Sequence, residues 1–356
     1  MKKEYLEFLE CPKCGSKSLE LKTLDLSPRI KDGSLYCVGC QATYPISNYI
    51  PRFSLSTPYA DSFGPQWRAF SKSQIDTDRA QESSIRFDSE IGWREDDVKG
   101  KTVVEFGSGA GRFVDVVSRR AAKLVVGLDA TDAVDAAQAN LVDRENVLFV
   151  QGDIFSPPFR KECFDFGYSI GVLHHTPDPE GGFCRLAGVI KARGNVAVSL
   201  YDISNYLRPN RNSIKVVTFE LLWALNAWRC ESFRAITTRL PSQLFLGYCK
   251  SVVPMLHVLN KIPVLRYVRY LLPSTCYRHL PVIWSMVDTH DTYATKIVHQ
   301  YRGKDIFQWF LHEGMSNIVL RNSRAGWVSI TGIVEEEEVK NQRRLFLEQP
   351  GAPGFD

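Results

Sequence analysis

The longest apolar stretches of the chain are short, rich in β-branched residues and separated by segments with helical periodicity. Few polar residues interrupt them, as expected for strands that are covered on both faces of a sheet. Strand–helix alternation of this kind predicts a doubly wound parallel α/β sheet, with its ligand at the carboxyl ends of the strands. The expected strands are TVVEF (102–106), KLVVGLDA (123–130), VLFVQGD (147–153), FDFGYSIGVLHH (164–175) and NVAVSLY (195–201).

Two later runs are expected to close this sheet. SNIVLRNS (316–323) and WVSITGIV (327–334) have the pattern of a final antiparallel pair of strands. We therefore expect a seven-stranded, mostly parallel sheet with an antiparallel last strand. The remainder, 335–356, is charged and then rich in proline and glycine, which predicts a flexible tail.

Residues 202–287 interrupt the sheet between its fifth and sixth strands. Leucine and aromatic residues alternate there with lysine and arginine, which predicts amphipathic helices broken at Pro254, Pro263 and Pro273. We favour a helical cap on the sheet edge. A second interpretation, compatible with the first, is a lid at a membrane surface that covers a bulky or lipid-linked ligand.

The composition is that of an ordinary globular protein, with 356 residues, 44% of them hydrophobic and 24% charged. That length suits one large domain plus a smaller one. A net charge of +4 does not suggest a protein that wraps nucleic acid through bulk charge, and no DNA partner is expected. We expect neither a signal peptide nor a spanning helix, because no run reaches roughly 18 apolar residues.

The nine cysteines indicate metal binding rather than a disulfide framework. Four form two C-x-x-C pairs, Cys11 with Cys14 and Cys37 with Cys40, which can supply four thiolates at tetrahedral geometry. Two disulfides or four free thiols are the alternative, but a reducing cytoplasm fits the scattered remaining cysteines best. Residues 1–55 hold too few apolar side chains to fold unaided, so we expect a structural Zn²⁺ ribbon there.

The first expected strand leads into a glycine-rich turn, VVEFGSGAGRF, for which two ligands compete. A dinucleotide loop follows G-x-G-x-x-G, whereas Gly107, Gly109 and Gly111 fall at every second position. Glu105 stands just before the first glycine, where a carboxylate would repel a pyrophosphate but attract an α-ammonium group. The turn therefore favours a methyl donor with an amino-acid portion over a dinucleotide.

Acidic residues end the next two expected strands. Asp129 can accept hydrogen bonds from the ribose hydroxyls of either ligand, and Asp153 can accept one from an adenine amino group. A solvated strand end is the alternative for both aspartates. From the residues alone, the prediction is an adenosine-containing ligand at a parallel sheet, with an ammonium partner near Glu105.

Four motifs, VVEFGSGAGRF, GLDA, QGDIFSPPF and FDFGYSIGVLHHTPDP, occur in this order. Over about residues 60–334 the chain resembles the class I S-adenosylmethionine-dependent methyltransferases, in the ubiquinone-biosynthesis-like group called type 11. LECPKCGSKSLEL and YCVGCQATYPISNYIPRF resemble the small zinc-ribbon proteins that activate some tRNA and rRNA methyltransferases. Those ribbons are usually partner chains. Here the resemblance implies a ribbon, 1–55, fused to a methyltransferase domain, 56–334, with S-adenosyl-L-methionine as co-substrate.

The resemblance also implies which residues contact the donor. Glu105 would hold the methionine ammonium group through the turn, and Asp129 would bind the ribose. Asp153 and Ile154 would bind the adenine, whereas Ser169 and Gly171 would line the methionine side. The expected donor contacts are Phe63, Gln66, Trp67, Glu105, Gly107, Gly109, Gly111, Asp129, Ala130, Asp153, Ile154, Ser169 and Gly171.

The segment before the sheet, 59–76, resembles the N-terminal lid of this methyltransferase group. Phe63, Gln66 and Trp67 would close over the donor, where Gln66 supplies polarity and the two aromatic rings exclude water. Helix packing of Phe63 on Trp67, one turn apart, is the alternative.

Methyl transfer is an in-line displacement at a sulfonium carbon, so the protein mainly aligns the nucleophile and excludes water. A general base is needed only where the acceptor must lose a proton, as a hydroxyl does. A structural hydrogen-bonding role is an equal alternative for His174 and His175. The candidate bases are His174, His175, Asp291 and Tyr293, the last two in a polar stretch that includes Asp288, His290 and His299.

Three functional hypotheses follow. The leading one is a cytoplasmic methyltransferase that acts on a small-molecule, glycan or lipid-linked acceptor. Under the second interpretation of the insert, this enzyme would also contact a membrane surface peripherally. The second is an RNA methyltransferase, because such ribbons recur in RNA-modifying systems, although the mild charge weighs against it. The third is a non-catalytic scaffold that binds the donor. The intact set of expected donor-binding residues argues against this third hypothesis.

Overall fold

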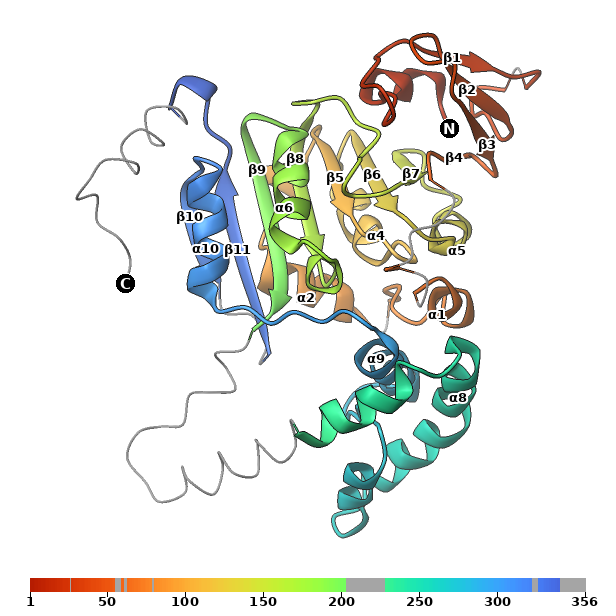
Figure 1. Cartoon of the computed structure of the whole chain (residues 1–356), viewed down its shortest axis with the longest axis vertical. Coiled ribbons are helices and arrows are strands. Elements are labelled where there is room, and N and C mark those ends of the chain that lie inside the picture. The colour runs from red at the N-terminus through yellow and green to blue at the C-terminus, as the bar shows by residue number, and fades with distance from the viewer. Residues whose placement is uncertain are drawn as a thin grey trace.

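Seven strands form one sheet at the centre of the molecule (Figure 1). This computed structural model describes residues 1–25, 27–54, 59–60, 63–78, 80–202, 228–321 and 326–339. The strand order is β10-β11-β9-β8-β5-β6-β7; β11 is antiparallel to both neighbours and the other pairs are parallel. The expected sheet with an antiparallel last strand is confirmed. Its strands are β5 (Thr102–Phe106), β6 (Leu124–Asp129), β7 (Val147–Gln151), β8 (Phe164–Ile170), β9 (Ile190–Tyr201), β10 (Ser316–Arg321) and β11 (Trp327–Ile333).

Helices cover both faces of this sheet because its inner strands are apolar on both sides. All residues of β5 are buried. Val104 lies in one hydrophobic core with α6 and α10, whereas Val103 lies in another with α2, α4 and α5. This doubly wound arrangement gathers the carboxyl ends of the parallel strands at one rim. The helices are α2 (Glu82–Glu90), α3 (Glu95–Val98), α4 (Arg112–Ser118), α5 (Ala133–Asn140), α6 (Pro179–Gly188) and α10 (Gly303–His312).

The N-terminal region forms a separate four-stranded antiparallel sheet that docks on the edge strand β7. Arg52 pairs with Gln151 in a parallel bridge, and the Phe53 N–H donates to the Gln151 carbonyl at 2.8 Å. The Arg52 guanidinium also donates to the Asp135 carboxylate at 2.6 Å. The ribbon thereby covers backbone groups that an open sheet edge would expose. Its elements are η1 (Lys3–Phe8), β1 (Leu19–Lys22), β2 (Gly33–Cys37), β3 (Thr43–Ser47) and β4 (Ile50–Pro51).

The ribbon and the large sheet share one hydrophobic core. Leu9 and Leu35 are fully buried and belong to the same cluster as Phe159 and Phe164. The ring of Phe8 stacks on that of Phe164, with 5.4 Å between their centres. Each buried side chain of this size stabilises the docked arrangement by about 1.5–3 kcal/mol. The predicted boundary at residue 55 falls within 55–58, outside the described residues.

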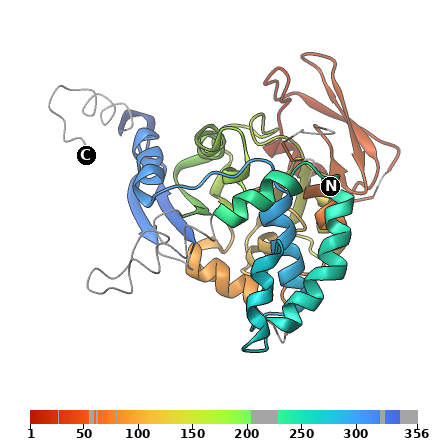
Figure 2. The ribbon, with the colours of Figure 1, turned by 60° about the horizontal axis from the view of Figure 1, so that its bottom comes forward.

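A helical unit, called the insert here, lies between β9 and β10 in the chain and below the sheet in Figure 1. Figure 2 shows α8 and α9 of this unit side by side. Phe245 and Cys249 of α8 are buried with Tyr293 of α9 in a core of their own. The predicted helical insert is present, although its residues 203–227 lie outside the described part, as do residues 340–356 of the predicted tail. The insert comprises a helical stretch at 228–237, α8 (Ser242–Leu259), η4 (Leu265–Leu271) and α9 (Val282–Ala294).

The prediction that Pro254 breaks a helix is wrong. Helix α8 continues through this residue from Ser242 to Leu259. Proline removes one backbone hydrogen bond. The buried side chains of Val253 and Leu256 pack in the core of the insert and hold the helix on both sides of the proline. Among the described helices, none combines the length and apolarity that crossing a membrane requires.

Candidate functional site

The glycine-rich turn joins β5 to α4 at the rim where the parallel strands end. The N–H groups of Gly107 and Ser108 donate to the Leu128 carbonyl at 2.7 and 3.0 Å, which ties the turn to β6. Gly107 has a φ of +81°, and a Cβ there would lie 2.4 Å from the Val172 side chain. Only glycine fits that position, so this part of the motif has a steric cause.

Asp129 ends β6 and holds the same turn from the other side. Its Oδ2 accepts from the Gly109 N–H at 2.8 Å, and its Oδ1 accepts from the Thr131 N–H and hydroxyl at 2.9 and 2.7 Å. Burial raises the pKa of this carboxyl, against the opposing effect of those donors. Each carboxylate oxygen has two lone pairs, so Oδ2 can still accept a hydrogen bond from a ligand hydroxyl.

Glu105 is buried beside the turn, with 2% of its surface exposed. Its Oε2 accepts a hydrogen bond from the Tyr168 hydroxyl at 3.2 Å. Burial raises the pKa of this carboxyl to about 8; Tyr168 opposes the rise, and nearby Asp129 adds to it. Glu105 is therefore largely protonated at neutral pH in this structure, and a cation beside it would favour the ionised form.

Asp153 follows β7 on the side of the ribbon. Its Oδ1 accepts from the Tyr59 hydroxyl at 2.9 Å and from the Phe155 N–H at 3.0 Å. Together with Lys13 and Tyr44 of the ribbon, Asp153 lines a cavity of about 420 Å³. The ribbon therefore contributes to the surroundings of the predicted adenine ligand.

The remaining predicted donor contacts on the sheet are largely buried. Ala130 and Ile154 are 7% and 3% exposed. The Ser169 hydroxyl donates to the Phe106 carbonyl at 2.9 Å, which holds the end of β8 to β5. Gly171 follows β8 with a φ of +77°. These residues line the rim, and their contacts with a donor remain predictions.

Helix α1 (Phe63–Ala69) lies over the turn. Trp67 comes within 3.1 Å of the place where a Cβ on Gly109 would stand. The Gln66 Oε1 is 2.8 Å from His290 Nδ1 of α9, and the ring of Phe63 lies 5.5 Å from that of His175. The three expected lid residues thus contact the turn, α9 and the short helix η2 (Leu173–His175).

His175 and Asp291 come together at the end of β8. His175 Nε2 lies 3.9 Å from Asp291 Oδ2, which also accepts from the Tyr201 hydroxyl at 3.1 Å. His175 Nδ1 is 2.9 Å from the Ile297 carbonyl, and because a carbonyl only accepts, Nδ1 carries the proton. Burial lowers the pKa of His175 despite the opposing effect of Asp291, so its imidazole is neutral at pH 7.

The structure places the other two candidate bases differently. His174 is fully buried with its ring centre 3.9 Å from that of Tyr201, and neither ring nitrogen has a hydrogen-bond partner among the described residues. Burial lowers its pKa well below the ordinary value. The Tyr293 hydroxyl lies 3.3 Å from the Cys230 Sγ, inside the core of the insert. His174 is therefore beside His175, whereas Tyr293 belongs to a separate cluster.

The four cysteines of the ribbon converge on one point. Their Sγ atoms all lie within 4.8 Å of one another, with 3.6 Å from Cys11 to Cys40 and from Cys14 to Cys37. Four sulfur atoms about 2.3 Å from a tetrahedral Zn²⁺ stand about 3.8 Å apart, so this set fits the ion and is too open for disulfides. The Tyr44 hydroxyl, 3.1 Å from the Cys11 Sγ, can donate to a metal-bound thiolate.

Sequence reasoning did not assign roles to Tyr201, Arg86 or Arg112. Tyr201 contacts Asp291, and both arginines lie close to the ring of Phe113, at 5.8 and 4.6 Å from its centre. Only the position of Arg112, directly after the last glycine of the turn, could have drawn attention to it.

Cys37→Ser should remove one of the four thiolates and unfold the ribbon, because bound zinc supplies the folding free energy of such small units. Metal analysis of the purified chain is expected to show zinc falling from about one per chain to near zero. Cys163→Ser, at a half-buried cysteine outside the cluster, serves as the control and should keep its zinc. Full zinc content in Cys37→Ser would contradict the four-cysteine site.

Glu105→Gln should gain stability relative to the wild type as the pH rises. The ordinary pKa of 4.5 applies to the unfolded chain and a value of about 8 to the folded one. The folded wild type therefore keeps a proton that the unfolded chain loses, which costs it up to about 1 kcal/mol per pH unit across that window. Denaturant unfolding of both proteins from about pH 5 to pH 8 measures the difference; one that stays constant with pH contradicts the prediction.

Comparison with known proteins agrees with the domain composition of the chain. Residues 104–198 match the family described as methyltransferase domain, and residues 2–48 match the family of Trm112p-like proteins. The sterol 24-C-methyltransferase of Saccharomyces cerevisiae is 26% identical over 129 residues, which cover 35% of this chain and 33% of the yeast protein. The match thus spans about a third of the length of that curated relative.

Solved structures give weaker similarities. A complex of the Haloferax volcanii Trm112 methyltransferase activator with a methyltransferase aligns at 12% identity and a TM-score of 0.43, over 80% of this chain and 100% of that one. An S-adenosylmethionine-dependent methyltransferase from Aquifex aeolicus aligns at 11% identity and a TM-score of 0.38, over 75% of this chain and 97% of that one.

The order of elements, the glycine turn and the four-cysteine cluster agree with the two family matches. The chain therefore joins a Trm112p-like four-cysteine ribbon to an S-adenosylmethionine-binding methyltransferase domain in one polypeptide.

Proposed function

We propose that the protein is an S-adenosylmethionine-dependent methyltransferase that acts on a small-molecule, glycan or lipid-linked acceptor. The observation that carries this proposal is the glycine turn of β5, which Asp129 holds and Trp67 covers. The His175–Asp291 pair stands at the end of the neighbouring strand β8. A turn that can hold the donor and a basic group at the same rim are what methyl transfer to a protic acceptor requires.

The bound donor supplies a sulfonium-activated methyl group. We assign Asp129 to the ribose hydroxyls, Asp153 with Ile154 to the adenine, and Ser169 with Gly171 to the methionine side. Trp67 and its helix exclude water from the turn, which protects an electrophilic donor and strengthens polar contacts. The buried Ser108 hydroxyl has no hydrogen-bond partner among the described residues and points to a polar ligand at the turn.

We assign the general base to His175 for acceptors that must lose a proton. Its Nδ1–H is held by the Ile297 carbonyl, so the lone pair on Nε2 can accept a proton. The nearby Asp291 carboxylate would stabilise the imidazolium that forms, and Tyr201 keeps Asp291 in place. Tyr293 has no part in this proposal because its hydroxyl contacts Cys230.

The surface of the insert supports a lipid-linked acceptor and peripheral contact with the cytoplasmic face of a membrane. Residues 228–294 contain eight lysines and arginines and three acidic residues, Glu231, Asp288 and Asp291, a net charge of +5, whereas the whole chain carries +4. Val264 and Leu271 are 80% and 72% exposed, beside Arg266 and Arg269. Basic and apolar side chains on one surface suit an anionic lipid interface.

The exposed aliphatic side chains favour a membrane over RNA as the partner of this surface. Proteins bind single-stranded RNA through basic groups and through aromatic rings that stack on bases. Aliphatic residues such as Leu244 and Val258, 66% and 59% exposed, gain nothing from that contact but are stabilised in an acyl layer. The yeast relative is named for a sterol acceptor, which supports a lipid acceptor here.

An RNA acceptor is the second candidate, and the Trm112p-like ribbon specifically favours it. The cavity that Asp153 shares with the ribbon supports a place for this module near the proposed adenine position. A scaffold that binds the donor without transferring its methyl group is the third candidate.

A labelling experiment should identify the acceptor class. Purified protein and methyl-labelled donor are incubated with cell extract separated into small metabolites, lipids and RNA. Asp129→Ala is the blank, because loss of the buried carboxylate should weaken donor binding by about tenfold or more. We expect label in the lipid or small-metabolite fraction. Label in RNA favours the second candidate, and no label despite donor binding in calorimetry favours the scaffold.

Reversal of the charges on the insert should weaken its binding to anionic membranes. Arg266→Glu with Arg269→Glu is expected to lower affinity for mixed phosphatidylcholine–phosphatidylserine vesicles by about tenfold or more in flotation assays. Lys99→Glu with Lys101→Glu, at exposed positions before β5, changes the net charge equally and should have little effect. If both double variants lose vesicle affinity equally, net charge alone explains the binding and a specific contact of the insert is ruled out.

A further inference from the structure

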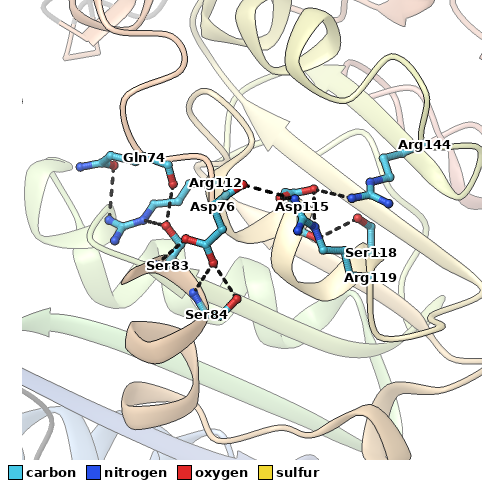
Figure 3. Close-up of polar contacts among 9 residues, drawn as sticks. All are labelled: Gln74, Asp76, Ser83, Ser84, Arg112, Asp115, Ser118, Arg119 and Arg144. Atoms are coloured by element: carbon cyan, nitrogen blue, oxygen red, sulfur yellow. Dashed lines mark hydrogen bonds and ion pairs between the residues drawn. The ribbon is translucent and has the colours of Figure 1, made fainter. Parts of the chain in front are cut away.

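Arg112 is a buried cation that forms no ion pair with any of the described residues. The residue is 7% exposed, and its guanidinium carbon lies 4.6 and 4.8 Å from the ring centres of Phe113 and Trp284. Its Nε donates to the Ser83 hydroxyl at 2.9 Å and its Nη1 to the Gln74 side chain at 3.3 Å, both neutral partners (Figure 3). Its Nη2 has no hydrogen-bond partner among the described residues. A buried charge without an opposite charge is costly, which marks this site as unusual.

Other arginines near the same helix do have acidic partners. Arg119 and Arg144 both bind the buried carboxylate of Asp115, at 2.7 and 3.1 Å, as Figure 3 shows. In the same figure, Asp76 accepts from the backbone of Ser83 and from the backbone and hydroxyl of Ser84, and it forms no ion pair with Arg112. Within the described part of the chain, these neighbouring arginines therefore have a carboxylate partner and Arg112 has none.

Arg86 adds a second guanidinium to the same place. Its Nε pairs with Glu90 at 2.7 Å, its head group stacks on Trp327 at 4.1 Å, and it shares the ring of Phe113 with Arg112. Its Nη2 is buried and has no hydrogen-bond partner within the described part of the chain. Each of these two guanidinium groups thus keeps one nitrogen without a partner among the described residues, and a planar guanidinium suits a carboxylate or phosphate.

The two arginines flank the proposed donor site. Arg112 directly follows Gly111 of the glycine turn, and Arg86 Nη2 lies 4.0 Å from the place where a Cβ on Gly171 would stand, at the end of β8. These are the two strand ends between which the methionine portion of the donor is proposed to lie. The adenine and ribose are assigned to Asp153 and Asp129, and no group so far has been assigned to the donor carboxylate.

We propose that Arg86 and Arg112 form a subsite for the carboxylate of the amino-acid portion of S-adenosylmethionine. This inference rests on the proposed function, since it concerns the donor of that reaction. The carboxylate would accept from both free Nη2 groups and offset the charge of Arg112. Burial, and next the charge of Arg86, lower the pKa of Arg112 to about 9, so an anion here would be favoured. The acidic groups Asp288, Glu90 and Asp76 act on Arg112 from beyond ion-pair distance and leave its Nη2 unused.

Two ligands that differ only in this group provide the test. Calorimetry on the full chain compares S-adenosylmethionine with its decarboxylated form, which keeps the amine and lacks the carboxylate. The wild type should prefer the carboxylate form by about 10- to 100-fold, as charge-assisted hydrogen bonds to a buried arginine do. Arg112→Gln and Arg86→Gln should each remove most of that preference and leave the affinity for the decarboxylated ligand nearly unchanged.

Arg119→Gln is the matched control, because it removes the arginine directly after the same helix, whose charge is already paired with Asp115. It should keep the full preference. Arg112→Lys, which retains the charge but loses the planar fork, should give an intermediate value, and thermal unfolding checks that each variant is folded.

The outcomes separate this inference from the function on which it rests. If the wild type binds neither ligand, the proposed function itself fails. If it binds the donor and both glutamine variants keep the wild-type preference, only the carboxylate subsite is wrong. If the variants weaken both ligands equally, the arginines support the turn rather than the carboxylate, which also overturns the inference.

Discussion

The hydrogen bond from the Gly109 N–H to the Asp129 carboxylate connects the two strand ends around which the site is built. Together with the bonds from Gly107 and Ser108 to Leu128, it closes the glycine turn against β6. The shape of that turn decides where α4 begins, and hence where Arg112 stands. It also forms the surface on which Trp67 lies. The lid, the helix start and the proposed donor contacts therefore depend on one small backbone arrangement.

Around this turn the fold buries ionisable groups that packing of an apolar core does not require. Burial raises the pKa of Glu105 to about 8 and lowers that of His175, and Arg112 lies against two aromatic rings with no ion-pair partner among the described residues. Replacement of such groups by apolar ones is often neutral or stabilising. Their concentration at the rim of a parallel sheet is therefore best explained by a ligand that carries complementary charges.

Two additions to the sheet approach this rim from different sides. The ribbon covers the edge strand β7 and reaches the neighbourhood of Asp153 through Lys13 and Tyr44. The insert approaches through α9, whose His290 contacts Gln66 and whose Asp291 lies beside His175. The glycine turn belongs to the large sheet and to neither of these two modules. A zinc ion in the ribbon and contacts made by the insert can nevertheless both influence the site around that turn.

The sequence by itself determined the features whose causes are local. Apolar runs predicted the strands, the close approach of Val172 requires glycine at position 107, and paired C-x-x-C turns placed four thiolates together. Tertiary structure alone decided which of the candidate general bases lie close together. Asp291 and Tyr293 are two positions apart on one helix, so they face nearly opposite sides, one toward Tyr201 and one toward the core of the insert. The surroundings of Arg112 come from segments far apart in the chain, and only packing brings them together, because burial and charge pairing are properties of the assembled core rather than of neighbouring residues.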